Sequence, residues 1–347
     1  MTESFVLTTE SEFSKALTEK KAVDVVSNQL GGQIVSVSDE WFAAAENLIK
    51  PSTPIRDATK FTYKGAWYDG WETRRHNELD YDCVIIKFGV HAATIVGAEI
   101  DTAYFNGNHA PAISVEALYS EEVVSSAPAI EEDDPRWKEV IHKVECGPSQ
   151  RHFLLRETAT ASGDKKFNFV KLKMYPDGGI ARFRLFGKVQ KPDNPSEDIC
   201  DLAFVGNGGV ISSYSDQHFG STNNLILPGR GHDMSDGWET KRSRTPGHID
   251  WVIVELGSVS SFIEKIIVDT AHYRGNFPQY ISVHGIKHDG KTELTAETEG
   301  WNELVGKCRT SADKEHVYDI NNNMNISHVK LTIFPDGGVK RIRVWGY

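Results

Sequence analysis

Apolar and polar residues alternate in short runs along the 347-residue chain, and this period of two predicts β-strands. Apolar and polar residues alternate on both sides of the sequence PDGG in residues 169–187, and the same pattern is repeated in residues 328–346. This pattern predicts a hairpin with the arginines of its second strand on a solvated face. Those arginines are Arg182, Arg184, Arg341 and Arg343. The continuous apolar runs CVIIKFGV (83–90) and WVIVELG (251–257) predict strands in the core.

Helical periodicity is limited to three short stretches, FSKALTEK near the N-terminus, WKEVIHKV from Trp137 and WNELV from Trp301. Many short strands separated by glycine-rich turns are typical of β-sandwiches and jelly rolls. The chain is therefore expected to be all-β, with few short helices.

The predicted strands belong to sequence blocks that occur twice in the same order. The paired blocks are Leu30–Pro51 with Asn207–Pro228, DGWETRR (69–75) with DGWETKR (236–242), Tyr81–Val90 with Ile249–Val259, Glu99–Leu118 with Ile267–Ile286, and Phe169–Gly187 with His328–Gly346. A repeat of this length indicates a duplicated domain rather than a solenoid. We predict two homologous jelly-roll β-sandwich domains, 1–190 with an N-terminal extension and 200–347, joined by a proline-containing linker at 191–199.

Composition narrows the class of protein. The net charge of −11 argues against a nucleic-acid partner, and no apolar run approaches the length of a membrane span. The N-terminus lacks the pattern of a secretory signal, and the four cysteines show no CxxC spacing. These features predict reduced thiols in a cytoplasmic protein.

The candidate chemistry lies in turns that follow predicted strands, because the common hydrolase, nucleotide and cofactor motifs are absent from the sequence. Each DGWET turn carries a carboxylate, Glu72 or Glu239, suited to proton transfer or to accepting two ureido N–H groups. Arg75 and Arg242 follow, and a guanidinium binds a carboxylate through two hydrogen bonds. A structural role in the turn remains open for each, and Trp238 either covers the end of the sandwich or stacks on a ligand.

The second copy has the richer polar set, because His272 and Arg274 replace Tyr104 and Asn106 of the first. Imidazole titrates near neutral pH and serves as an acid, a base or a metal ligand. The catalytic candidates are Glu239, His272 and Asp269. The candidates for substrate binding are Arg242, Arg274, Trp238 and Asn276, with Glu72 and Arg75 in the first copy. The candidates for a metal are His232 and Asp236, although no tight three-ligand spacing appears.

In their duplicated order, these blocks resemble the allantoicase family over nearly the whole chain. The resemblance rests on LGG…SD, NLIKP and NLILPGRG, both DGWET[RK]R blocks, both DTA…GN blocks and both PDGG sequences. It implies a jelly roll in each half, a homo-oligomer, and hydrolysis of allantoate to ureidoglycolate and urea in purine catabolism. It implies no certain cofactor, and a divalent metal stays an open question.

The implied substrate also bears on which copy is active. Allantoate carries one carboxylate and two identical ureido groups, so a single product enantiomer requires an asymmetric site. The second copy, with its different neighbouring residues, is therefore favoured. The alternative class is a non-enzymatic jelly-roll protein that binds a carbohydrate or another small ligand, and a third is a structural assembly protein. The order of motifs along the whole chain favours the enzyme.

Overall fold

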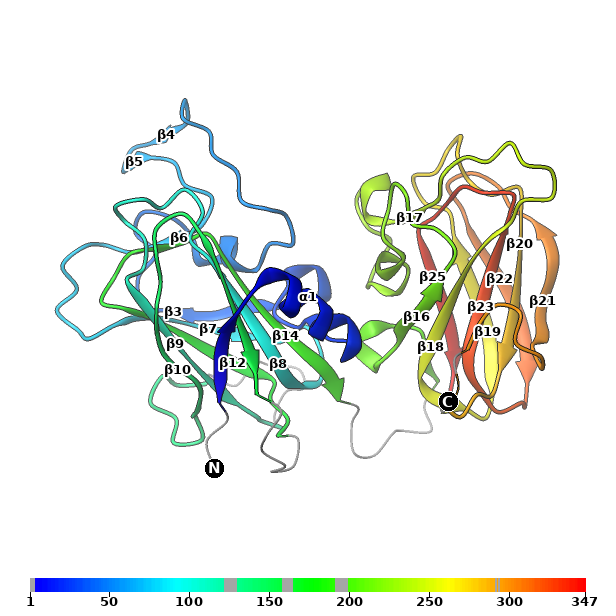
Figure 1. Ribbon diagram of the computed structural model, residues 1–347, viewed down its shortest axis with the longest axis horizontal. Helices are drawn as coiled ribbons and strands as arrows, with labels where there is room; N and C mark the ends of the chain where they lie inside the picture. Colours follow the sequence, from blue (N-terminus) through cyan, green and yellow to red (C-terminus); the bar gives the residue numbers. More distant parts are fainter. Residues whose placement is uncertain (1–3, 122–129, 158–164, 191–198, 291, 293) are drawn as a thin grey trace. The chain divides into compact units, whose positions relative to one another are not determined.

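The computed structural model describes residues 4–121, 130–157, 165–190, 199–290, 292 and 294–347. The chain forms two compact units, Met1–Gln190 and Lys191–Tyr347, and each contains a β-sandwich (Figure 1). The linker expected at 191–199 lies outside the described residues, except for Ile199.

The first unit is a sandwich of two five-stranded antiparallel sheets, with the orders β1-β11-β8-β14-β2 and β10-β9-β12-β7-β3. Two short pairs, β6 with β13 and β4 with β5, stand apart from these sheets. The strands are β1 (Phe5–Thr8), β2 (Val23–Asp24), β3 (Gln33–Val37), β4 (Phe61–Thr62), β5 (Gly65–Ala66), β6 (Trp71–Glu72), β7 (Asp82–Lys87), β8 (Ala92–Asp101), β9 (Ala112–Leu118), β10 (Lys138–Glu145), β11 (Arg151–Arg156), β12 (Phe169–Tyr175), β13 (Gly179–Ile180) and β14 (Arg182–Gln190). The helices are α1 (Glu10–Glu19) and the 3₁₀ turns η1 (Asn28–Leu30) and η2 (Ala45–Ile49).

The second unit repeats this plan with the sheets β15-β25-β19-β22 and β16-β18-β23-β20-β21 and the short pair β17 with β24. Its strands are β15 (Cys200–Asp201), β16 (Val210–Tyr214), β17 (Trp238–Glu239), β18 (Asp250–Ser260), β19 (Ile263–Asp269), β20 (Tyr280–Ile286), β21 (Asn302–Arg309), β22 (Glu315–Asn322), β23 (Ile326–Phe334), β24 (Gly338–Val339) and β25 (Arg341–Gly346). The 3₁₀ turns are η3 (Val205–Asn207), η4 (Thr222–Ile226) and η5 (Met234–Asp236).

The predicted fold class is confirmed: both units are β-sandwiches with corresponding strand orders, except that β1 has no counterpart among the described strands of the second unit. The apolar runs predicted as core strands contain most of β7 and part of β18, which are interior strands with a neighbour on each side. All ten residues of β8 are buried, and Phe13 of α1 packs against the strand at Gly97. Helix α1 begins at a capping box in which the Thr9 and Glu12 side chains bond each other's backbone N–H groups. In the described part of the chain, no helix is both long and apolar enough to span a membrane.

Two of the three helices expected from the sequence are wrong. All of WKEVIHKV after Trp137 lies in β10, and all of WNELV after Trp301 lies in β21. Each of these strands lies at the edge of its sheet. In both strands, buried and exposed residues alternate irregularly. In β10 the pairing with β9 also shifts twice, which breaks the period of two. The irregular spacing therefore imitates a helical pattern.

The hairpin expected around PDGG is also wrong. Strand β12 pairs with β7 and β9, whereas β14 pairs with β8 and β2 in the other sheet. The PDGG sequence thus carries the chain from one sheet to the other, and β23 and β25 repeat this crossing in the second unit. The arginines expected on a solvated face are largely enclosed, since Arg182 is 0% and Arg341 2% exposed.

Candidate active site

The DGWET turn is anchored by its tryptophan in both units. Trp71 and Trp238 are fully buried, and each indole Nε1 donates to a backbone carbonyl, of Asp39 and Asp216 respectively, at 2.8 Å. A buried indole with a satisfied N–H fixes the position of the chain around it. The glutamate that follows is therefore presented from a rigid point. Because Trp238 is enclosed in this way, its indole forms part of the support and is not exposed to a ligand.

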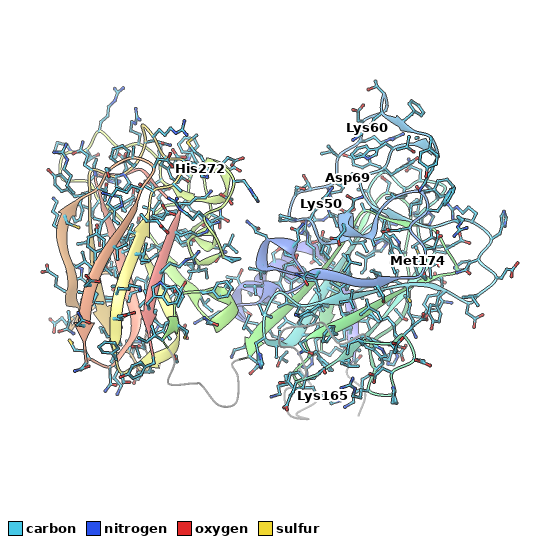
Figure 2. The ribbon with its side chains drawn as sticks, turned by 180° about the vertical axis from the view of Figure 1, so that it is seen from behind. Lys50, Lys60, Asp69, Lys165, Met174 and His272 are labelled. Carbon is cyan, nitrogen blue, oxygen red and sulfur yellow. The ribbon has the colours of Figure 1, made fainter. Side chains whose placement is uncertain are left out.

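The aspartate of the turn is paired with cationic side chains in both units, and its arginine partner is buried in each. Asp69 accepts from Arg182 Nη2 at 2.7 Å and from Lys50 Nζ at 3.3 Å, and Figure 2 shows Lys50 beside Asp69. In the second unit, Asp236 pairs with Arg341 at 3.3 Å and with Lys340. Arg182 and Arg341, which were expected on a solvated face, thus connect the strand after PDGG to the DGWET turn.

A pocket of about 520 Å³ in the second unit joins three of the residues predicted for the site. Glu239 comes from β17, Arg242 from the loop after it, and Asn276 from the loop between β19 and β20. The remaining lining residues are Phe219, Thr240, Ser243, Gly275, Phe277, Gln279, Pro335, Asp336 and Gly337. The pocket therefore combines a carboxylate, a guanidinium and amide groups with apolar side chains.

A glutamate–asparagine pair occupies the same position in both units. Asn276 Nδ2 donates to Glu239 Oε1 at 2.6 Å, and Asn108 Nδ2 donates to Glu72 Oε1 at 2.7 Å. The pair orients one carboxylate oxygen and leaves the other for a ligand. Glu72 is 7% exposed, and burial raises the pKa of its carboxyl. Glu239 is only half-buried and faces the pocket.

The arginine after the turn differs between the units. Arg75 Nη1 donates to Asp177 Oδ1 at 2.9 Å, which neutralises its charge. Arg242 is exposed and, among the residues that the structure describes, has no carboxylate partner. A guanidinium without an internal partner is available to an anion, so the second unit offers the cationic group that the sequence predicted.

Three other candidates of the second copy do not line the pocket. Asp269 is 2% exposed and is held by Arg230 through Nε and Nη2 at 2.8 and 2.9 Å. It also accepts from the backbone N–H of Ala271, so it shapes the loop that leads to Asn276. His272, labelled in Figure 2, donates its backbone N–H to Asp313, and Arg274 pairs with the same carboxylate at 3.5 Å. The side chain of Arg274 is 80% exposed.

The two metal candidates do not form a metal site. Asp236 is engaged by Arg341 and Lys340, and the backbone N–H of His232 donates to it at 3.3 Å. The part of the chain that the structure describes contains no group of three or more histidine, cysteine, aspartate or glutamate residues that could hold a metal ion. These residues therefore do not fit a bound metal.

Several pocket residues were not predicted from the sequence. Phe219 and Gln279 lie within the repeated blocks but outside the DGWET and DTA…GN motifs that carried the candidate chemistry. The hairpin expected at PDGG gave Asp336 no role beyond that turn. In the structure Asp336 Oδ2 accepts from the backbone N–H of Ser243 at 2.7 Å and lines the pocket. Both PDGG and DGWET are repeated, which was a signal that they act together. The two motifs lie far apart in the sequence, however, and only the crossing between the sheets brings them into contact.

The fold is a duplicated jelly roll, and in the part of the second unit that the structure describes, a pocket brings together a carboxylate, a guanidinium and an amide. A sequence model described as the allantoicase repeat matches residues 23–190 and 200–347. The chain belongs to the allantoicase family.

Individual relatives match more than nine-tenths of the chain. An allantoicase from Saccharomyces cerevisiae is 63% identical, over 99% of each chain, and one from Neurospora crassa is 51% identical, over 93% of this chain and 90% of the relative. A crystal structure of allantoicase from Saccharomyces cerevisiae has a TM-score of 0.83 at 60% identity, covering 99% of this chain and 100% of that chain.

Proposed function

We propose that this protein hydrolyses allantoate to ureidoglycolate and urea, in the pocket of the second unit. One observation carries the location of the reaction: Glu239, Arg242 and Asn276 line a single pocket in a chain of the allantoicase family. The pocket volume of about 520 Å³ suits a ligand of this small size.

Arg242 binds the carboxylate of the substrate. Its guanidinium is exposed and has no carboxylate partner among the described residues, so it needs no rearrangement before it binds. A planar guanidinium and a carboxylate form two parallel hydrogen bonds, which fix the orientation of the central carbon as well as its position. The two ureido groups then become inequivalent, because only one of them points toward Glu239.

Glu239 carries out the proton transfer, and Asn276 positions it. In the reaction, the bond between the central carbon and one ureido nitrogen breaks. The elements of water are added, with the hydroxyl on the carbon and the proton on the departing nitrogen. A positioned carboxyl group contributes about 10²- to 10⁴-fold to such a step. The hydrogen bond of 2.6 Å from Asn276 holds one carboxylate oxygen, so the other faces the ligand.

Asp269 supports the position of Asn276 and does not contact the substrate. Its carboxylate joins Arg230 to the backbone N–H of Ala271 and so fixes the loop that carries Asn276. His272 and Arg274, which share Asp313, stand on the same loop outside the pocket lining and are assigned no step.

We further propose that the protein is a cytoplasmic homo-oligomer. All four cysteines are free, as expected of a protein from a reducing compartment. Large apolar side chains exposed on the first unit, among them Ile55, Phe61 and Tyr63, are consistent with burial against a second copy.

The proposed reaction is tested by incubating the purified protein with allantoate and measuring urea, with and without a chelator. We expect urea release in both conditions from the wild type and a large loss in Arg242→Ala. The matched control is Arg244→Ala, which removes an exposed arginine of the same loop that does not line the pocket. Ligand binding without urea release would contradict the hydrolase and favour a binding protein instead. Loss of activity only with the chelator would show that a metal ion takes part.

A further inference from the structure

The duplication places two versions of one motif in a single chain, and the two versions differ in what surrounds the arginine. Both units keep the glutamate–asparagine pair at nearly the same distance. Arg75 is paired with Asp177, whereas Arg242 faces the pocket without an internal carboxylate. The aspartate itself is present in both units, since Asp336 is the counterpart of Asp177. Something other than residue identity therefore separates the two states.

The two units differ in which backbone N–H of the loop after the arginine donates to that aspartate. In the first unit the chain passes through His76 with a φ of +62°, and the N–H of Asn77 donates to Asp177 Oδ2 at 3.1 Å. In the second unit Ser243, the residue directly after Arg242, donates to Asp336 Oδ2 at 2.7 Å. The backbone contact is thus made one residue earlier.

This shift in the backbone hydrogen bond accompanies a different position of the guanidinium. In the first unit the second residue after the arginine makes this hydrogen bond, and Arg75 Nη1 reaches Asp177 Oδ1 at 2.9 Å. In the second unit the first residue after the arginine makes this hydrogen bond, and Arg242 lines the pocket without an ion pair to Asp336.

We propose that each chain has one allantoate site. In the first unit the carboxylate of Asp177 binds Arg75, as the substrate carboxylate binds Arg242 in the second. This inference rests on the proposed function, in which Arg242 binds that carboxylate. Asp177 is 6% exposed and cannot move out to release Arg75 without losing its backbone contact. The first-unit motif is therefore a closed version of the site, occupied by a group of its own chain.

Other contacts in the first unit close the same region. Trp41, next to the counterpart of the pocket residue Phe219, has Lys64 Nζ at 4.5 Å and Arg74 at 5.3 Å from its ring. Lys64 lies between β4 and β5, in a segment that is longer than the corresponding part of the second unit. The pocket residue Gln279 is replaced by Pro111, which has no side-chain hydrogen-bonding group.

The number of sites is tested by calorimetric titration with allantoate in a Glu239→Gln background, which slows turnover while keeping the shape of the pocket. We expect about one allantoate per chain. Arg242→Ala should abolish the binding and Arg75→Ala should leave it intact. Asp177→Asn, which keeps an oxygen for Asn77 but removes the charge, should raise the number of sites toward two.

Two sites per chain in the parent protein would overturn the proposal, as would binding that survives Arg242→Ala and disappears in Arg75→Ala. A folded Asp177→Asn chain with only one site would also overturn it, with folding checked by circular dichroism. If that variant does not fold, the parent and the two arginine variants still decide the count. Failure of the proposed function is seen separately, as a wild-type protein that releases no urea.

Discussion

Asn276 is the residue whose role is defined most narrowly by its contacts. Its amide donates to Glu239 at 2.6 Å, and its counterpart Asn108 makes the same bond to Glu72. An amide can hold a carboxylate in place without adding charge, whereas an aspartate at this position would bring a second carboxylate into contact. The pair would then share one proton.

We therefore expect Asn276→Asp to lower kcat for urea release by about 100-fold, within the range that a positioned acid or base contributes. The KM should change less, because Arg242 still binds the substrate carboxylate. Steady-state kinetics check both values. Asn108→Asp is the matched control, and equal losses in the two variants would contradict the assignment of the reaction to the second unit.

Trp238 contributes to stability rather than to binding. Its side chain is fully buried and its Nε1 donates to the backbone carbonyl of Asp216. Trp238→Phe leaves that carbonyl without its partner, which costs about 1–3 kcal/mol of unfolding free energy. Urea denaturation measures this loss. An increased KM with unchanged stability would instead mean that the indole touches the substrate.

At the residue scale, the sequence identified Glu239, Arg242 and Asn276 because each belongs to a duplicated motif with suitable chemistry. It also selected His272 and Arg274 because they differ between the copies, although neither lines the pocket. The backbone N–H of His272 and the side chain of Arg274 both contact Asp313. A difference between repeats marks a change of surroundings, and it does not reveal which way a loop side chain points.

At the scale of elements, the alternation of apolar residues was sufficient for the central strands and insufficient for the connections. Strands β7 and β18 followed directly from their apolar runs. The crossing from β12 to β14 could not be predicted, because a local pattern of strand, turn and strand is the same whether the two strands pair or enter opposite sheets. The burial of Arg182 follows from that crossing, since it brings the arginine to Asp69.

The end of β2 supplies a prediction about pH. Asp24 faces Arg184 at 3.4 Å, yet burial raises its pKa from 3.8 to about 6. The folded protein then binds a proton more tightly than the unfolded chain. The contribution of this group to stability is fully present below pH 3.8 and is lost as the pH rises through 6.

Asp24→Asn should remove this dependence. Between pH 4 and pH 7 the wild type should lose up to about 3 kcal/mol of unfolding free energy relative to the variant. Denaturant unfolding at a series of pH values checks the difference. Parallel curves for the two proteins would show that Asp24 is ionised throughout this range.

At the scale of the whole molecule, duplication is the feature that the sequence showed most fully. The order of five paired blocks predicted two sandwiches, and the two have corresponding strand orders. Comparison of the copies favoured the second one, but it could not predict the structural difference on which we base the proposal of one site per chain. That difference includes a one-residue shift in a loop contact, at Asn77 in one unit and Ser243 in the other.

The proposed homo-oligomer is tested by sedimentation velocity. We expect a species larger than the 38.7 kDa of one chain at micromolar concentration. Replacing Phe61 and Tyr63, which are 69% and 88% exposed, by serine should reduce the association while leaving each unit folded. A monomer across the concentration range would contradict the proposal.

The central claim is that the reaction takes place at Glu239 and not at its counterpart Glu72. The most direct measurement compares urea release from allantoate by Glu239→Gln and Glu72→Gln, two substitutions that remove one charge at equivalent positions. We expect a loss of about 100-fold or more in kcat for Glu239→Gln and nearly wild-type turnover for Glu72→Gln. Equal losses in both variants, or a greater loss in Glu72→Gln, would contradict the account.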